Sequence, residues 1–130
     1  MSDVLVIDDE HIERILLTRL VSKIDSSIEV VVFDYAEEAM SYLRSPERKV
    51  PRLIFVDINM PRVDGFQFAE DFAELYPELR GDSQVWMMSN SIDPRDRERA
   101  EKSPSVQGYI EKSGSDQAFL DVISGAFGAN

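Results

Sequence analysis

The sequence contains no cysteine, one histidine and one tryptophan. The lack of cysteine excludes disulfide bonds and thiolate metal sites, and it is consistent with a cytoplasmic protein. Basic residues are also scarce, because 14 lysines and arginines stand against 25 aspartates and glutamates, for a formal net charge of −11. Phosphates would be repelled by this charge, so we expect no direct binding of nucleic acid and instead expect a cation or a basic partner surface.

Long hydrophobic runs are missing as well. No run approaches the roughly 20 apolar residues that cross a bilayer, so we expect no membrane insertion. The N-terminus, MSDVLVIDDE, has no basic segment before its apolar run, which excludes a signal peptide. The 43% hydrophobic and 30% charged content over 130 residues is ordinary for a soluble globular protein. We therefore expect residues 1–130 to form a single cytoplasmic domain.

Short apolar runs alternate with segments of helical period along the whole chain. Strand-like runs occupy residues 3–8, 28–33, 53–57, 84–88 and 108–110. Residues 93–101 form a highly charged helical segment, in which Asp93 can cap the helix, Pro94 suits its first turn and Ala100 is the main apolar anchor. This alternation predicts an α/β fold with a parallel sheet covered by helices on both faces. The apolar helical stripes comprise Ile12, Ile15, Leu16, Leu20 and Ile24; Ala36, Ala39, Met40 and Leu43; Phe66, Ala69, Phe72, Ala73 and Tyr76; and Phe119, Leu120, Ile123 and Phe127.

Polar side chains follow four of the five predicted strands. In an open α/β sheet the ligand site lies beyond the carboxyl ends of the strands. Carboxylates that converge there raise each other's pKa values unless a cation compensates, and oxygen ligands suit Mg²⁺. For Asp8 and Asp9, capping of the first helix is the alternative interpretation. The residues are Asp8, Asp9 and Glu10 after the first strand, Asp57 at the end of the third, Ser89 and Asn90 after the fourth, and Glu111 and Lys112 after the fifth.

A carboxylate beside Mg²⁺, a lysine and a hydroxyl together suit phosphoryl transfer. Asp57 can act as the nucleophile and become an aspartyl phosphate. The metal and Lys112 would neutralise charge on the transferred oxygens, and the Ser89 hydroxyl could hydrogen-bond one of them. Each residue alone has a plainer interpretation, such as a surface lysine or a turn serine. Their positions at the ends of different strands favour the catalytic interpretation.

Four segments resemble the receiver domain of two-component response regulators, of the stand-alone, CheY-like kind. They are VLVIDDE, LIFVDINMPRVDGF, WMMSNS and GYIEK, and the resemblance runs from about Asp3 to Phe127. It implies a flavodoxin-like (βα)5 three-layer sandwich with a five-stranded parallel sheet of order 2-1-3-4-5. It also implies a signalling domain and not an enzyme, although phosphorylation and dephosphorylation can be autocatalytic.

The resemblance implies a role for each acid of the site. Asp57 would accept a phosphoryl group from a sensor histidine kinase or a histidine phosphotransfer protein. Asp9 and Asp57 would bind Mg²⁺ through their side chains and Asn59 through its main-chain carbonyl, while Asp8 would help through water.

The resemblance further implies a switch. Ser89 would move toward the phosphoryl group and Tyr109 would turn inward behind it, because a phosphate adds roughly −1.5 to −2 charge and biases a bistable packing element. This movement would remodel the face built from the fourth helix, the fifth strand and the fifth helix, where a downstream protein partner would bind.

Two positions depart from the family pattern. Ser113 follows Lys112 where the family usually has a proline in a cis peptide bond, so we expect a trans bond, because a non-proline cis bond costs roughly 3–4 kcal/mol. Asn90 stands where a very small residue is common, and its carboxamide either crowds the phosphoryl group or donates to it. His11 is expected to be an exposed helix residue near the acidic pocket.

Two other functions remain open at this stage. The first is a phosphorylation-independent adaptor of the same fold, in which Ser113 and Asn90 have weakened the phosphorylation-driven switch. The second is a Mg²⁺-dependent phosphohydrolase that uses Asp57 as its nucleophile, although that class prefers a second acid where Asn59 stands.

Overall fold

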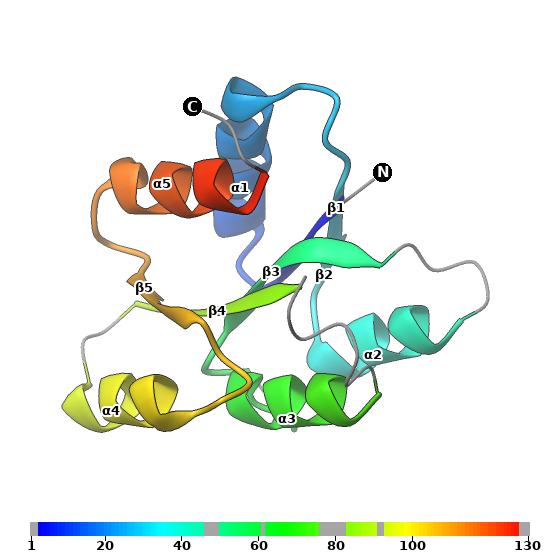
Figure 1. The fold of residues 1–130 in the computed structure, drawn as a ribbon, viewed down its shortest axis with the longest axis vertical. Coiled ribbons are helices and arrows are strands. Elements are labelled where there is room, and N and C mark those ends of the chain that lie inside the picture. The colour runs from blue at the N-terminus through cyan, green and yellow to red at the C-terminus, as the bar shows by residue number, and fades with distance from the viewer. Residues whose placement is uncertain (1–2, 46–49, 61, 76–82, 91–92, 128–130) are drawn as a thin grey trace.

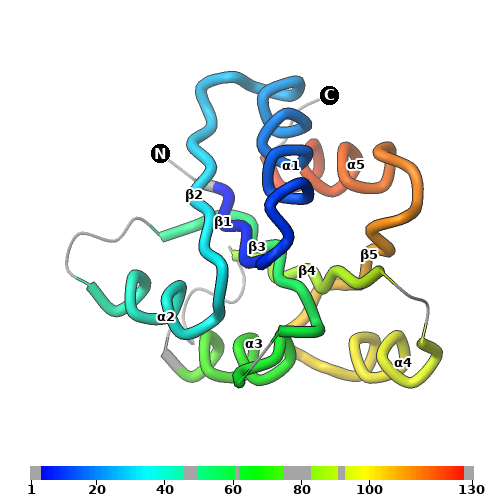
Figure 2. Tube along the Cα trace, turned by 180° about the vertical axis from the view of Figure 1, so that it is seen from behind, coloured from blue at the N-terminus to red at the C-terminus, as the bar shows by residue number. Residues whose placement is uncertain are grey.

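The computed structural model describes residues 3–45, 50–60, 62–75, 83–90 and 93–127, so that Pro61 and Tyr76 lie outside the described residues. Five parallel strands form one sheet in the order β2-β1-β3-β4-β5 (Figure 2). This is the flavodoxin-like order that the resemblance implies, and the prediction is confirmed. The strands are β1 (Asp3–Ile7), β2 (Val30–Phe33), β3 (Pro51–Asp57), β4 (Gln84–Ser89) and β5 (Gly108–Glu111).

Helices cover both faces of the sheet, as the unbroken apolar runs of the central strands require. Figure 1 shows α1 and α5 on one face and α2, α3 and α4 on the other. Two hydrophobic clusters follow the same division, one beneath each layer of helices. The helices are α1 (His11–Ile24), α2 (Ala36–Arg44), α3 (Gly65–Leu75), α4 (Pro94–Lys102) and α5 (Asp116–Phe127). In the described part of the chain, no helix is both long and apolar enough to cross a membrane.

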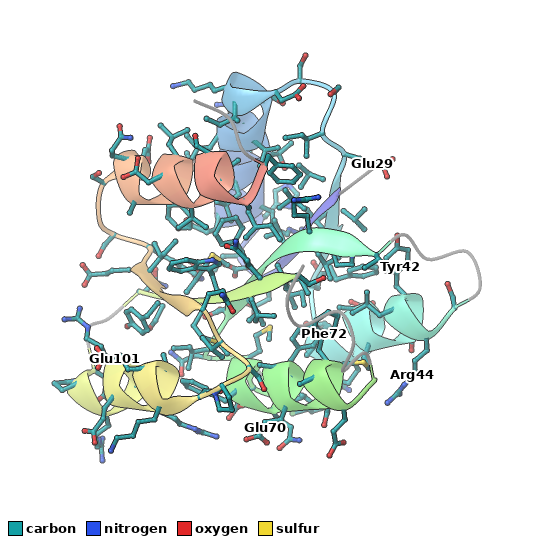
Figure 3. The ribbon with its side chains drawn as sticks, in the orientation of Figure 1. Glu29, Tyr42, Arg44, Glu70, Phe72 and Glu101 are labelled. Carbon is teal, nitrogen blue, oxygen red and sulfur yellow. The ribbon has the colours of Figure 1, made fainter. Side chains whose placement is uncertain are left out.

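The apolar stripes predicted for α2 and α3 face the sheet. Ala36, Ala39, Met40 and Leu43 are all buried, as are the described members of the α3 stripe. Figure 3 shows Tyr42 and Phe72 directed toward the sheet, whereas Glu70 points away from it. On the opposite face, Phe55 of β3 and Phe119 of α5 meet edge to face with ring centroids 5.5 Å apart. The core therefore fixes the sheet from both sides and holds the strand ends in register.

The predicted face of α1 is wrong in its first half. Ile12 is 80% exposed and Ile15 is 41% exposed. The buried residues of this helix are Leu17, Leu20 and Val21, of which the predicted stripe includes only Leu20. Seven of the 14 residues of α1 are apolar, so they cover more than one face, and periodicity alone does not determine which face meets the sheet.

The charged helix α4 begins as its sequence predicts. The Asp93 side chain accepts a hydrogen bond from the Arg95 backbone N–H, and Pro94 occupies the first turn. Ala100 is the buried residue of this helix. The helix therefore buries little apolar surface, which is typical of elements that open locally.

Trp86 and Gly108 are neighbours across β4 and β5 in the sheet. A Cβ atom added to Gly108 would lie 2.4 Å from the indole ring of Trp86, closer than any unstrained contact. A larger residue at this position of β5 would therefore displace the Trp86 ring.

Candidate functional site

The expected site residues gather at the carboxyl edge of the sheet. Asp8 directly follows β1, Asp57 and Ser89 end β3 and β4, and Lys112 directly follows β5. All four residues are buried, and Asp8 and Ser89 are each 0% exposed. The backbone N–H of Lys112 donates to the Ser89 carbonyl at 2.8 Å, which extends the pairing of β4 and β5 to the site. Lys112 and Ser89 are therefore interior residues of the site and not a surface lysine and a turn serine.

The close approach of α3 fixes the backbone around Asp57. A Cβ atom on Gly65, the first residue of α3, would lie 2.7 Å from the Asp57 carbonyl oxygen, so only glycine fits there. The Asn59 backbone N–H donates to Asp57 Oδ1 at 3.1 Å. Asp64 caps α3 by accepting from the Gln67 backbone N–H at 2.9 Å. Asp57 is therefore not needed as a cap, which leaves its carboxylate for the site.

Three carboxylates converge here into a group that could hold a metal ion. One ligand oxygen each from Asp8, Asp9 and Asp57 lies within 4.8 Å of the others. Asp9 is exposed, whereas the other two acids are buried. An all-oxygen set with one side open to water is what Mg²⁺ prefers, because it keeps several of its waters. Helix capping does not account for Asp8, because the N-cap position of α1 is Glu10.

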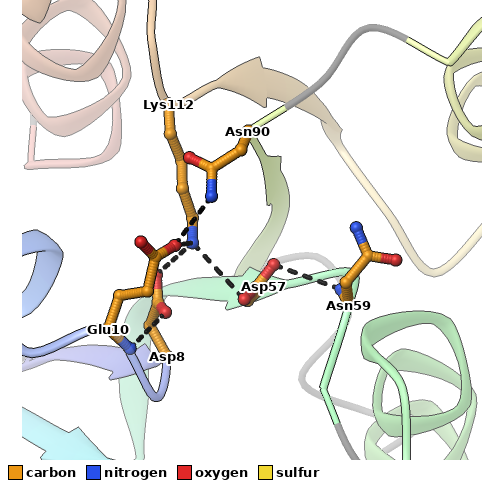
Figure 4. A network of polar contacts seen from close by, with 6 residues as sticks. All are labelled: Asp8, Glu10, Asp57, Asn59, Asn90 and Lys112. Carbon is orange, nitrogen blue, oxygen red and sulfur yellow. Dashed lines mark hydrogen bonds and ion pairs between the residues drawn. The ribbon is translucent and has the colours of Figure 1, made fainter.

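The Lys112 ammonium lies among the carboxylates (Figure 4). Its Nζ atom is 2.7 Å from Asp8 Oδ2, 2.8 Å from Glu10 Oε1 and 3.3 Å from Asp57 Oδ2. The Lys112–Ser113 peptide bond is trans, as predicted. Without a cis bond to shape the loop, three ion pairs hold the amine in the pocket.

Burial and neighbouring charges shift the pKa values of the acids and of Lys112 in opposite directions. Burial, partly offset by the Lys112 ammonium, raises the pKa of Asp57 to about 6. Burial likewise raises the pKa of Asp8, while its contact with Lys112 acts in the opposite direction. Burial alone would lower the pKa of Lys112, but its bonds to Asp8 and Glu10 outweigh that effect and raise it. Lys112 is therefore charged at neutral pH and is the resident counter-ion of the acids.

Glu10 and Asn90 form a pair in the site that the sequence analysis did not predict, although it placed both residues at the ends of strands. The Asn90 side-chain amide donates to Glu10 Oε1 at 2.9 Å, and the same oxygen accepts from Lys112 (Figure 4). These contacts with Lys112 and Asn90 lower the pKa of Glu10. The only sequence signal for Glu10 is its place as the third acid after the first strand. Asn90 binds Glu10 in this structure, which neither of the two roles considered for its carboxamide includes.

Tyr109 lies on β5, where it pairs with Met87 of β4, two residues before Ser89. Its ring is partly buried against the core cluster beneath α2, α3 and α4. The Arg97 guanidinium of α4 lies 5.8 Å from the ring centroid, which is a cation–π contact. The predicted switch residue therefore contacts α4, the charged helix whose buried residue is Ala100.

His11 is exposed at the start of α1, as predicted. Its Nδ1 atom lies 2.8 Å from the Arg14 guanidinium. The contact is local to α1 and is not one of the described polar contacts of Asp57.

Solved structures share this fold over nearly the whole chain. A two-component response regulator from Cytophaga hutchinsonii superposes with a TM-score of 0.84 at 26% identity, covering 98% of both chains. A response regulator receiver protein from Dyadobacter fermentans gives a TM-score of 0.79 at 25% identity, again over 98% of both chains. The chemotaxis response regulator CheY4 of Vibrio cholerae, at 19% identity, has a TM-score of 0.76 and shows the shared fold alone.

A curated relative is a protein-glutamate methylesterase/protein-glutamine glutaminase of Xanthomonas oryzae, 28% identical over 120 residues. The match covers 84% of this chain but only 33% of that protein, so the esterase activity does not transfer with it. An uncharacterized protein of Leptolyngbya boryana is 38% identical over 73 residues, which are 56% of this chain and 52% of that protein. The sequence model described as the response regulator receiver domain matches residues 4–124, and the chain therefore belongs to the response regulator receiver family of two-component signalling.

Proposed function

We propose that this chain is a phospho-accepting switch in which Asp57 receives a phosphoryl group in a two-component phosphorelay. The observation that supports this most strongly is the buried Asp57 carboxylate, which lies 3.3 Å from the Lys112 ammonium and within 4.8 Å of two further carboxylates. Receiver domains work with histidine kinases or phosphotransfer proteins, and we assign a partner of that class as the phosphodonor.

Asp57 is suited to act as the nucleophile. A pKa of about 6 leaves most of its carboxyl groups ionised at neutral pH, and it also makes the carboxylate more basic than an exposed one. One Asp57 oxygen attacks phosphorus and forms the acyl phosphate bond. The bond between phosphorus and the donor histidine nitrogen breaks, and that nitrogen keeps the electron pair.

Asp9 and Asp57 would hold Mg²⁺ through their side chains and Asn59 through its main-chain carbonyl, with Asp8 helping through water. When bound, the metal neutralises charge on the transferred oxygens. Lys112 supplies a second positive charge 3.3 Å from the Asp57 carboxylate, and its burial strengthens that interaction. The Ser89 hydroxyl, buried at the end of β4, can donate to a phosphoryl oxygen.

We assign the output surface to α4, β5 and α5. Tyr109 connects this surface to the site, because it lies on the strand next to Ser89 and contacts Arg97 of α4. Moving the Ser89 hydroxyl toward a phosphoryl group vacates space behind it, which an aromatic ring can enter. A downstream protein partner would then read the changed position of α4.

The test is incubation with acetyl phosphate and Mg²⁺, followed by intact-mass measurement. We expect the mass of one phosphoryl group to be added to the parent chain and no addition to Asp57→Asn. Asp121→Asn, which changes an exposed aspartate of α5, is the matched control and should gain the group normally. A parent chain that gains no phosphoryl group would instead support the phosphorylation-independent adaptor.

A further inference from the structure

The Lys112 ammonium has three N–H donors, and three carboxylates surround it. The shortest of these contacts are to Asp8 and Glu10, at 2.7 and 2.8 Å, whereas the acceptor Asp57 is 3.3 Å away. The amine therefore lies closer to the two acids that follow β1 than to the phosphoryl acceptor Asp57. Because the contact to Asp57 is the longest of the three, we expect the amine to move toward Asp57 to donate to a phosphoryl oxygen, which lengthens its contact with Asp8 or Glu10.

Glu10 is held in position at both of its ends. Its backbone N–H donates to Asp8 Oδ1 at 2.9 Å, which fixes the turn between β1 and α1. Its Oε1 atom accepts from Asn90 at 2.9 Å, which joins the N-cap residue of α1 to the residue that follows β4 (Figure 4). Asn90 thus keeps the Glu10 carboxylate directed at Lys112.

Of the two acids that compete for Lys112, Glu10 is the one whose contact with the amine breaks at the lower cost. Its side chain is 47% exposed, so water can solvate the carboxylate once the contact is broken. Asp8 is 0% exposed, and separating it from Lys112 would leave a buried charge unpaired. The Glu10 contact is therefore the one that opens when Lys112 turns to a phosphoryl group.

We propose that Glu10, fixed by Asn90, is a positioning residue that restrains Lys112 away from Asp57 and slows phosphorylation of the acceptor. This inference rests on the proposed function of Asp57 as the phosphoryl acceptor. Glu10 thereby sets how readily the unphosphorylated chain switches, without itself contacting the phosphoryl group.

The test compares phosphorylation rates of the parent chain and Glu10→Gln with acetyl phosphate and Mg²⁺, followed by intact mass. Acetate leaves as the acyl phosphate on Asp57 forms. We expect Glu10→Gln to react roughly fivefold faster, the size of effect expected from losing one partly exposed ion pair. Asn90→Ala should accelerate the reaction by less, because Glu10 remains but loses its anchor. The double variant should be no faster than Glu10→Gln alone, since both changes act on the same contact.

A matched control distinguishes restraint of the Lys112 amine by Glu10 from simple repulsion between the negative charge of Glu10 and the anionic acetyl phosphate. Glu111→Gln removes one negative charge next to Lys112 in the sequence, yet within the described residues Glu111 is not among the ion-pair partners of the amine. Charge repulsion would accelerate Glu111→Gln as well, and the effect would fade between about 0.1 M and about 1 M salt. Restraint of a buried amine predicts an acceleration specific to Glu10→Gln that persists at the higher salt concentration.

A readout without phosphoryl transfer complements the rates. Beryllofluoride imitates a phosphoryl group on the acceptor, and ¹⁹F NMR measures its binding directly. We expect roughly fivefold tighter binding to Glu10→Gln than to the parent chain, on the same basis of one partly exposed ion pair. Equal or slower rates and equal or weaker beryllofluoride binding in Glu10→Gln, with a parent chain that is phosphorylated, would overturn the inference alone. If no variant is phosphorylated, the proposed function fails and this inference fails with it.

Discussion

Replacing Asp57 with asparagine should stabilise the fold at neutral pH. Burial raises the pKa of Asp57 from 3.8 to about 6. A carboxyl group with a higher pKa in the folded state than in the unfolded state binds protons more tightly when folded, so ionising it costs stability. The cost is absent below pH 3.8, grows between pH 3.8 and about 6, and is constant at higher pH.

The magnitude follows from the pKa difference. Six minus 3.8 is about 2.2, which at 1.36 kcal/mol per pH unit gives a cost of about 3 kcal/mol at pH 8. This cost already includes the attraction between Asp57 and the Lys112 ammonium, because that attraction lowers the pKa of Asp57. The expected gain from asparagine is therefore about 3 kcal/mol at pH 8, and it falls to about half of that at pH 5, where most of the folded parent carboxyl is protonated.

Urea unfolding followed by the fluorescence of the single tryptophan, Trp86, measures this gain in the free energy of unfolding. EDTA keeps divalent cations from masking the repulsion among the acids. Asp121→Asn changes an exposed carboxylate and should shift stability by only a few tenths of a kcal/mol at both pH values. A destabilised Asp57→Asn, or a gain that is the same at pH 5 and pH 8, would refute the burial of an ionised carboxylate at this position.

Three further predictions follow from the site and its supports. Mg²⁺ at ten times its dissociation constant should raise the free energy of unfolding of the parent chain by about 1.4 kcal/mol in the same urea titrations. Asp57→Asn should gain less than half as much, and an equal gain would mean that the ion binds elsewhere. Arg97→Ala should cost about 0.5–1 kcal/mol in thermal unfolding and shift the NMR signals of the Tyr109 ring, whereas Arg97→Lys should retain most of the contact; unchanged ring signals would contradict the cation–π contact. Gly65→Ala should cost about 1–3 kcal/mol, because its Cβ meets the Asp57 carbonyl, and an unchanged melting temperature would contradict that close approach.

The sequence was sufficient to predict the sheet and the meeting of the acids. Uninterrupted apolar runs identify the central strands, and parallel strands carry whatever follows them to one edge. The convergence of Asp8, Asp9 and Asp57 follows from that topology, and the structure brings the three carboxylates together. The placement of Lys112 depends on the same logic, although its partners could not be read from the sequence.

Local pattern failed where packing between distant elements decides the outcome. The exposed Ile12 and Ile15 fit a helical stripe as well as the buried residues do, and only the seating of α1 against the sheet and α5 distinguishes the two faces. The contact between Glu10 and Lys112 joins residues 102 positions apart, and the contact between Glu10 and Asn90 joins residues 80 apart. A third acid after the strand suggests a charge at the site but not its partner.

The tight fit of Gly108 against the Trp86 ring has a consequence for how this sequence can vary. A side chain at position 108 requires the indole at position 86 either to shift or to be replaced by a smaller side chain, since the added Cβ would lie 2.4 Å from the ring. The two positions should therefore change together among descendants of this chain. A descendant that replaces Trp86 with a smaller residue can accept other residues at position 108, on the strand that carries Tyr109. The residue on β4 therefore limits which substitutions β5 tolerates.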